Sequence, residues 1–88
     1  MAILVTTRVK GQTAQGYGHV STLLHDLVRS SPGFVLHCAY QDEDWTVLEV
    51  WNSKSEADQF FARNVVPNLP KGLVPKRSYK ELHALVTP

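Results

Sequence analysis

The chain has 88 residues, a length that fits one small domain and leaves no room for a second. Its apolar fraction of 43% is that of an ordinary globular chain, which excludes wholesale disorder. Nine Lys and Arg residues against eight Asp and Glu give a net charge of +1, so neither a nucleic-acid platform nor a polybasic membrane binder is expected.

The first two predicted elements are a strand and a helix. Residues 3–9 are rich in β-branched side chains and are followed by Gly11, which predicts a strand. From about residue 17 to residue 30, apolar residues recur at the spacing of an amphipathic helix, namely Val20, Leu23, Leu24, Leu27 and Val28. The segment Ser-Ser-Pro-Gly at 30–33 should stop this helix.

The middle of the chain predicts a β-hairpin. Residues 34–40 and 45–51 each have the pattern of a strand, and the short polar segment 41–44 joins them. A four-residue loop would pair Tyr40 with Trp45, Cys38 with Val47, Leu36 with Glu49 and Phe34 with Trp51. A one-residue slip of this register is the alternative, and it would exchange the two faces of one strand.

A second helix and a last strand complete the chain. Residues 53–56, Ser-Lys-Ser-Glu, form a capping box, and Ala57, Phe60, Phe61 and Val65 mark the buried face of the helix that follows. Pro67 should end this helix, and the proline-rich residues 67–75 predict an ordered loop. Residues 77–86 alternate like a strand.

This order predicts an α+β, ferredoxin-like βαββαβ domain over residues 1–88, with an antiparallel sheet and both helices on one face. The hairpin carries large apolar residues on both of its faces, and no further element is left to cover the second face. A chain of this size buries only about 60–65% of the surface that its unfolded form exposes. We therefore expect a second copy to cover the open face in a two-fold homodimer.

Two segments resemble the antibiotic biosynthesis monooxygenase family. They are Ser31-Pro32-Gly33-Phe34, which opens the second strand, and Val47–Ala57, which contains the pattern E-x-W-x-S-x-x-x-A. The first strand before Gly11 also fits. The resemblance covers nearly the whole chain and implies a small dimeric α+β barrel. The family includes cofactor-free quinol and polyketide monooxygenases, haem-degrading enzymes, isomerases and members without a known activity.

The resemblance transfers only some site residues. The strand-end tryptophan of the family, which lines its pocket, corresponds to Trp51. Polyketide monooxygenases have an asparagine four residues earlier and a tyrosine about six residues later, where this chain has Val47 and Ala57. Haem-degrading relatives have an asparagine on the first strand and a histidine on the second helix, and this chain has neither. Haem degradation is therefore not expected.

Two of the four histidines are candidates for a general base. The histidines have no metal-ligand spacing, so no metal site is predicted. His19 and His25 fall on or beside the polar face of the first helix, where solvation is expected. His37 and His83 lie within predicted strands among apolar residues, and a neutral histidine there could accept a proton near neutral pH. The alternative for both is a core histidine with one hydrogen bond.

Candidate binding residues gather on the hairpin and the second helix. Tyr40 and Trp51 could stack a flat aromatic substrate, and Phe60 and Phe61 could close the pocket on the helix side. Glu49 shares the face of Trp51 in the predicted register. It is expected either to pair with a cation such as Arg8 or to act as a base.

The hypothesis from these residues is a cofactor-independent monooxygenase that acts on a small hydrophobic, aromatic, polyketide-like or quinol molecule. A cofactor-free isomerase or cyclase of a reactive ketone, and a dimer that only binds a metabolite, remain alternatives. No glycine-rich phosphate loop or nucleotide fingerprint supports a nucleotide cofactor. The early apolar run, Ala2–Val5, is too short to span a membrane. The single cysteine, Cys38, is expected to be a buried inert thiol in a cytoplasmic protein.

Overall fold

The computed structural model describes all 88 residues. Four strands and two main helices follow one another as β1 (Ile3–Val9), α1 (Ala14–Arg29), β2 (Phe34–Gln41), β3 (Trp45–Trp51), α2 (Lys54–Phe60) and β4 (Pro75–Glu81). A π-helical turn, η1 (Phe61–Val65), and a 3-10 turn, η2 (Val66–Asn68), continue α2. The predicted α+β, ferredoxin-like order of elements is confirmed.

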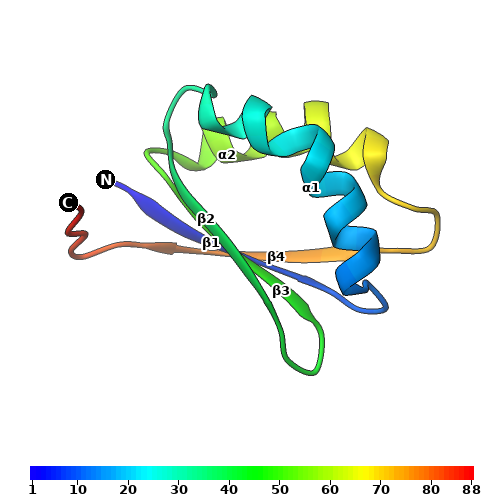
Figure 1. Ribbon diagram of the computed structural model, residues 1–88. Coiled ribbons are helices and arrows are strands. Elements are labelled where there is room, and N and C mark those ends of the chain that lie inside the picture. The colour runs from blue at the N-terminus through cyan, green and yellow to red at the C-terminus, as the bar shows by residue number, and fades with distance from the viewer.

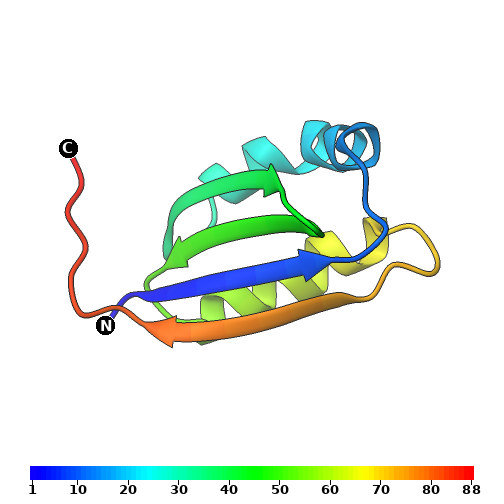
Figure 2. The same ribbon diagram turned by 90° about the horizontal axis from the view of Figure 1, so that it is seen from below.

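The four strands form one antiparallel sheet in the order β2-β3-β1-β4. Both helices lie on the same face of this sheet (Figure 1), and the opposite face carries no helix (Figure 2). α1 lies toward the β2 edge, whereas α2 lies behind β1 and β4. None of the helices has the length and hydropathy that crossing a bilayer requires.

Short polar contacts fix where the helices begin. Thr13 caps α1 by accepting a hydrogen bond from the Gly16 amide at 3.0 Å, so the helix begins at Ala14, a few residues before the predicted start. Ser53 accepts from the Glu56 amide at 3.1 Å and donates its hydroxyl to the Glu56 carboxylate at 2.9 Å. The predicted capping box is therefore present.

The core lies between the sheet and the helices. Trp51 and Val5 are fully buried at its centre, with Ile3, Val28, Ala57 and Phe60 around them. α1 contributes Leu24 and Val28, whereas Leu23 and Leu27 are about half exposed. The apolar stripe predicted for this helix is therefore wider than the face that it buries.

The hairpin register differs from the predicted one by one residue. Gln41 pairs with Trp45, Ala39 with Val47 and His37 with Glu49, because the loop holds residues 42–44 only. A β-bulge between Phe34 and Leu36 then restores the predicted pair of Phe34 with Trp51. The slip turns His37 toward the helices, beside Glu49, and turns Tyr40 to the open face.

β4 ends earlier than predicted, at Glu81. Its only neighbour is β1, whose first residue, Ile3, pairs with Glu81. One more hydrogen bond, from the Leu82 amide to the Ala2 carbonyl at 2.9 Å, lies beyond this last pair. β1 begins at Ile3, so residues after Glu81 have no residue of β1 opposite them. Residues 83–88 form an exposed tail, so the predicted strand position of His83 is wrong.

The open face of the sheet is partly apolar. Leu36 and Tyr40 of β2 are 37% and 43% exposed, and Leu48 of the neighbouring strand β3 and Leu4 of β1 belong to the same face. Cys38 belongs to the same face and is exposed, so the expected burial of its thiol is wrong. Two helices cannot cover both faces of one sheet, and this face is the one they leave open (Figure 2).

Candidate active site

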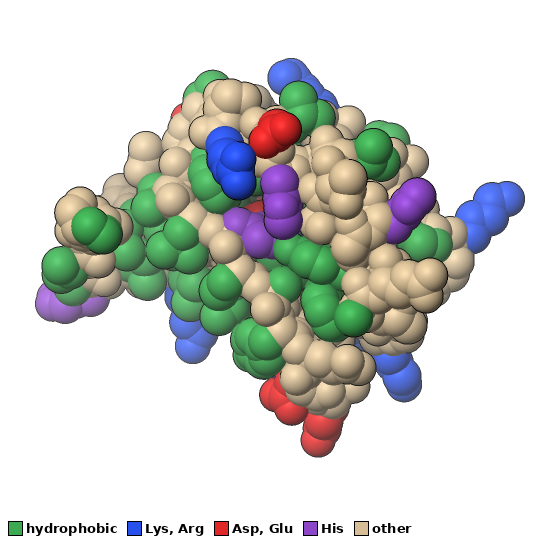
Figure 3. All heavy atoms as spheres, viewed as in Figure 1, with side chains coloured by type: hydrophobic (Ala, Val, Ile, Leu, Met, Phe, Trp, Pro, Cys, Tyr) green, Lys and Arg blue, Asp and Glu red, His purple; other side chains and the backbone are tan.

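A cavity lies between the sheet and the helices, and most of its walls are apolar. The strands contribute Thr7, His37, Trp45, Glu49 and Arg77, among others, and the helices contribute Tyr17, Leu24, Phe60 and Phe61. Figure 3 shows histidine side chains near the middle of this side of the molecule, with apolar side chains beside them. A mostly apolar cavity with a few convergent polar groups has the character of a small-molecule site.

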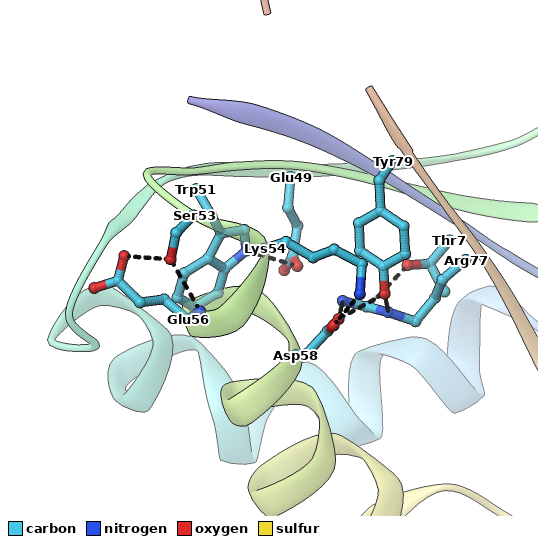
Figure 4. Close-up of polar contacts among 9 residues, drawn as sticks. All are labelled: Thr7, Glu49, Trp51, Ser53, Lys54, Glu56, Asp58, Arg77 and Tyr79. Carbon is cyan, nitrogen blue, oxygen red and sulfur yellow. Dashed lines mark hydrogen bonds and ion pairs between the residues drawn. The ribbon is translucent and has the colours of Figure 1, made fainter. Parts of the chain in front are cut away.

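A chain of hydrogen bonds runs through one wall of the cavity. The Tyr17 hydroxyl lies 2.5 Å from Nε2 of His37, and Nδ1 of His37 lies 2.6 Å from the Glu49 carboxylate. The other Glu49 oxygen accepts from the Trp51 indole N–H at 3.1 Å, as Figure 4 shows. The side chains of His37 and Glu49 are 19% and 12% exposed, so this chain is largely shielded from water.

These partners fix the tautomer of the neutral His37 ring. A carboxylate can only accept hydrogen bonds, so Nδ1 carries the proton that is donated to Glu49. Nε2 is then the acceptor, and the Tyr17 hydroxyl donates to it. A histidine that is oriented by a carboxylate and accepts a hydrogen bond at its second nitrogen can take up a proton at that nitrogen, as a general base does.

Tyr17 enters this chain from the first turn of α1. Its ring lies 5.0 Å from that of Trp45 and 6.0 Å from that of His37, measured between ring centroids. Burial raises the pKa of the Tyr17 hydroxyl, and the nearby Glu49 carboxylate raises it further. The hydroxyl is therefore protonated at neutral pH and able to donate. His25 lies on the solvent side, 3.5 Å from the same hydroxyl.

A second polar cluster lies at the opposite edge of the sheet (Figure 4). Asp58 of α2 accepts from the Tyr79 hydroxyl at 2.6 Å and from Lys54 at 2.7 Å. Arg77 of β4 lies 3.5 Å from the same carboxylate, donates to the Thr7 hydroxyl at 3.2 Å, and stacks 4.0 Å above the Phe61 ring. The Arg77 side chain is only 11% exposed, and it lines the cavity.

The cluster keeps Asp58 ionised. Burial acts to raise the pKa of Asp58, but the hydrogen bonds from Lys54 and Tyr79 outweigh it, and the pKa is lowered. One carboxylate is thus shared among three donors, of which Arg77 is the most distant. Arg77 therefore retains positive charge that is directed at the cavity.

Sequence comparisons and structure comparisons give different results. No protein-family model matches the sequence, and no curated protein matches it. Solved structures do match. SnoaB, a cofactor-independent oxygenase from Streptomyces nogalater, has a TM-score of 0.73 at 11% identity, over 99% of this chain and 98% of SnoaB.

Two further matches are of the same kind. An inferred antibiotic biosynthesis monooxygenase from Deinococcus radiodurans has a TM-score of 0.63 at 17% identity, over all of this chain and 98% of the other. The ActVA-Orf6 monooxygenase of Streptomyces coelicolor, solved with the ligand Nanaomycin D, has a TM-score of 0.55 at 20% identity, over 99% of this chain and 91% of its own. This chain shares the fold of these structures. The resemblance inferred from the sequence is confirmed at the level of the fold.

Four of the predicted site residues line the cavity: His37, Glu49, Phe60 and Phe61. Their catalytic and binding roles stay predictions. Trp51 does not line the cavity, because it is fully buried behind Glu49 and packs against Phe34 and Phe60.

Two other predicted site residues lie outside the cavity. Tyr40 points to the open face because of the register slip, and His83 lies on the exposed tail because β4 ends at Glu81. The expected pair of Arg8 with Glu49 is also wrong, since Arg8 is exposed on the open face and Glu49 bonds to His37 instead.

Three polar residues that line the cavity are not among the site residues predicted from the sequence. Tyr17 precedes the apolar stripe of α1, and Arg77 lies at the start of the predicted last strand, where no motif marks it. His25 was placed on the polar face of α1, where it is exposed, but it also borders the cavity mouth. The alternation of β4 puts Arg77 on the same face as Tyr79 and would have placed it toward the helices. No three His, Cys, Asp or Glu side chains converge as metal ligands.

Proposed function

We propose that this protein is a cofactor-independent oxygenase of a small, electron-rich aromatic or quinol-type molecule. The observation that carries the proposal is the pair of His37 and Glu49, which faces an apolar cavity with the charge of Arg77 on its far side. A base in a water-poor site can turn an acidic carbon or phenol into a carbanion, and the carbanion can react with O2 directly.

The atoms balance with O2 as the only oxidant. For a substrate such as anthrone, the activated CH2 group loses one proton, and the carbanion adds O2 to give a peroxide anion. The peroxide regains a proton and then loses water, so that CH2 and O2 become a ketone and H2O. Arg77 stabilises the oxygen anion that carries the carbanion charge, because a buried cation acts most strongly on charge that develops during the reaction.

Oxygen consumption with anthrone tests this proposal. We expect the purified protein to accelerate O2 uptake at least about 100-fold over the uncatalysed reaction. The His83→Gln variant, altered on the exposed tail, serves as a matched control and should keep the wild-type rate. Absence of accelerated uptake across anthrone and a naphthohydroquinone would contradict the proposal.

A cofactor-free isomerase or cyclase is the second candidate. Val47 lines the cavity where polyketide monooxygenases of the resembling family have an asparagine, and Ala57 stands where they have a tyrosine. The same base could serve a reaction that consumes no oxygen. A product that forms from a reactive ketone at an unchanged rate under nitrogen would favour this candidate.

We also propose that the protein works as a homodimer joined through the open face of the sheet. Leu36 and Tyr40 are exposed there, and residues of neighbouring strands extend the apolar surface. A second copy offers the same surface across a two-fold axis, so both copies bury it together.

Sedimentation should find about twice the chain mass of 9.9 kDa at micromolar concentration. The Leu36→Lys variant should sediment as a monomer, because it places a charge on the proposed interface without disturbing the protomer core. Leu23→Lys changes a more exposed leucine on α1, away from this face, and should leave the dimer intact. A wild-type monomer, or a Leu36→Lys dimer of unchanged affinity, would count against this interface.

A further inference from the structure

Both ring nitrogens of His37 are occupied. Nδ1 donates to Glu49 at 2.6 Å, and Nε2 accepts from the Tyr17 hydroxyl at 2.5 Å. To remove a proton from a substrate directly, an imidazole needs a ring nitrogen whose lone pair is not already in a hydrogen bond. No nitrogen of His37 is free in this way, so a substrate in the cavity cannot reach the ring directly while Tyr17 stays in place.

Tyr17 and His37 both line the cavity, and the Tyr17 hydroxyl occupies Nε2 of His37. This hydroxyl donates to His37, and its oxygen keeps a lone pair that can accept one more hydrogen bond. The Tyr17 ring packs beside that of Trp45 at 5.0 Å, and Thr13 caps the helical turn that carries it. His25 is the other group near this oxygen, but at 3.5 Å it is the more distant of the two histidines.

We propose that the Tyr17 hydroxyl oxygen exchanges the proton with the substrate, and that His37 and Glu49 act through it as a relay. This inference rests on the proposed function, because it names the atom that performs the deprotonation. Tyr17 is then the catalytic residue that touches the substrate, whereas His37 receives the proton and Glu49 is a positioning residue.

The proton balance of the relay closes within one turnover. As the substrate C–H bond breaks, its proton forms a bond to the Tyr17 oxygen, and the former Tyr17 proton moves to Nε2 of His37. The electron pair stays on the substrate carbon, and the imidazolium is held beside the Glu49 carboxylate. After O2 has added, the same two shifts run backward and return one proton to the peroxide anion.

The surroundings of Tyr17 favour this concerted transfer over a standing phenolate. Burial and the Glu49 carboxylate raise the pKa of Tyr17, so a free phenolate would be costly in this wall. In the relay the phenol oxygen gains a proton while it loses one, and no charge accumulates on it. The positive charge forms instead on His37, next to a carboxylate 2.6 Å away.

A gating role for Tyr17 is the rival explanation, and it predicts the opposite effect. If Tyr17 only blocked Nε2 of His37, its hydroxyl would have to leave before the substrate could bind there. Removal of the hydroxyl would then free the base and raise the rate. In the relay, removal of the hydroxyl takes away the group that passes the proton to His37, and the rate falls.

The test measures deuterium exchange at the acidic carbon of anthrone under nitrogen, so that it follows deprotonation without oxygenation. Tyr17→Phe keeps the ring against Trp45 and removes only the hydroxyl, and His37→Gln removes the proton acceptor. We expect each variant to lower the exchange kcat about 100-fold with KM nearly unchanged. The double variant should lose no more than either single variant, because the two residues work as one unit.

The outcomes are separable. His19→Gln, on an exposed position of α1, is the matched control and should exchange like the wild type. A Tyr17→Phe rate at or above that of the wild type, a double variant that loses the product of both effects, or a wild type that does not accelerate exchange would overturn the relay. Exchange that depends on Tyr17 without any accelerated O2 uptake would sustain the relay and remove the oxygenase.

Discussion

Replacement of Glu49 with glutamine is expected to lower kcat about 100-fold or more while the protein stays folded. Glu49 accepts two hydrogen bonds, from Nδ1 of His37 at 2.6 Å and from the Trp51 indole at 3.1 Å. A glutamine has one oxygen and one NH2 group, so it cannot accept both. The oxygen will serve one donor, and the NH2 group will face the other.

The consequence for His37 is a change of tautomer. If the glutamine oxygen keeps the Trp51 bond, its NH2 group donates to Nδ1, and the ring proton moves to Nε2. Nε2 can then no longer accept the proton from Tyr17, and the relay stops although every side chain remains in place. The imidazolium also loses the carboxylate that stabilises it.

NMR of the imidazole nitrogens and steady-state kinetics together check this prediction. The wild type should show a proton on Nδ1 of His37, and Glu49→Gln should show it on Nε2. Glu81→Gln alters an exposed carboxylate on β4 and should keep both the wild-type tautomer and the wild-type kcat. If Glu49→Gln kept more than about a third of the wild-type kcat, Glu49 would have no essential part in the reaction.

The sequence predicts the elements of this fold well because their signals are local. The spacing of Leu24 and Val28 marks the buried side of α1, and Ser53 with Glu56 marks the start of α2 within four residues. The end of β4 depends on another strand instead. Its alternating pattern continues through His83, but β1 offers no residue for that segment to pair with.

The site was harder to predict because it depends on register. A shorter loop moves the pairing of β2 by one residue, and the bulge near Val35 restores the predicted pair at Phe34, so only that end of the hairpin is the same in both registers. Residues 36–41 of β2 change faces, and they include His37 and Tyr40. Both faces of β2 carry apolar residues, so hydrophobic alternation does not choose between the two registers. The contact of His37 with α1 is tertiary and leaves no mark in the local sequence.

Trp51→Ala is expected to lower the free energy of unfolding by about 3–5 kcal/mol. A domain of this size has a total free energy of unfolding of roughly 5–13 kcal/mol, so the loss is a large share of it. Trp51 is fully buried, and its ring packs against Phe34 and Phe60 with centroids 5.4 and 5.7 Å away. Alanine leaves a cavity in the core and an unpaired oxygen on Glu49. Much of the chain should then be unfolded under mild denaturing conditions.

Trp51→Phe separates packing from hydrogen bonding at the same position. Phenylalanine keeps most of the ring contacts but cannot donate a hydrogen bond to Glu49. We therefore expect Trp51→Phe to lower the free energy of unfolding by about 1–2 kcal/mol. Urea unfolding followed by circular dichroism at one fixed protein concentration measures both variants, because the stability of a dimer depends on concentration. Since Trp51 lies behind Glu49 and not on the cavity wall, Trp51→Phe should leave KM nearly unchanged. A variant of wild-type stability with a strongly raised KM would instead place this ring against the substrate, as the family resemblance first implied.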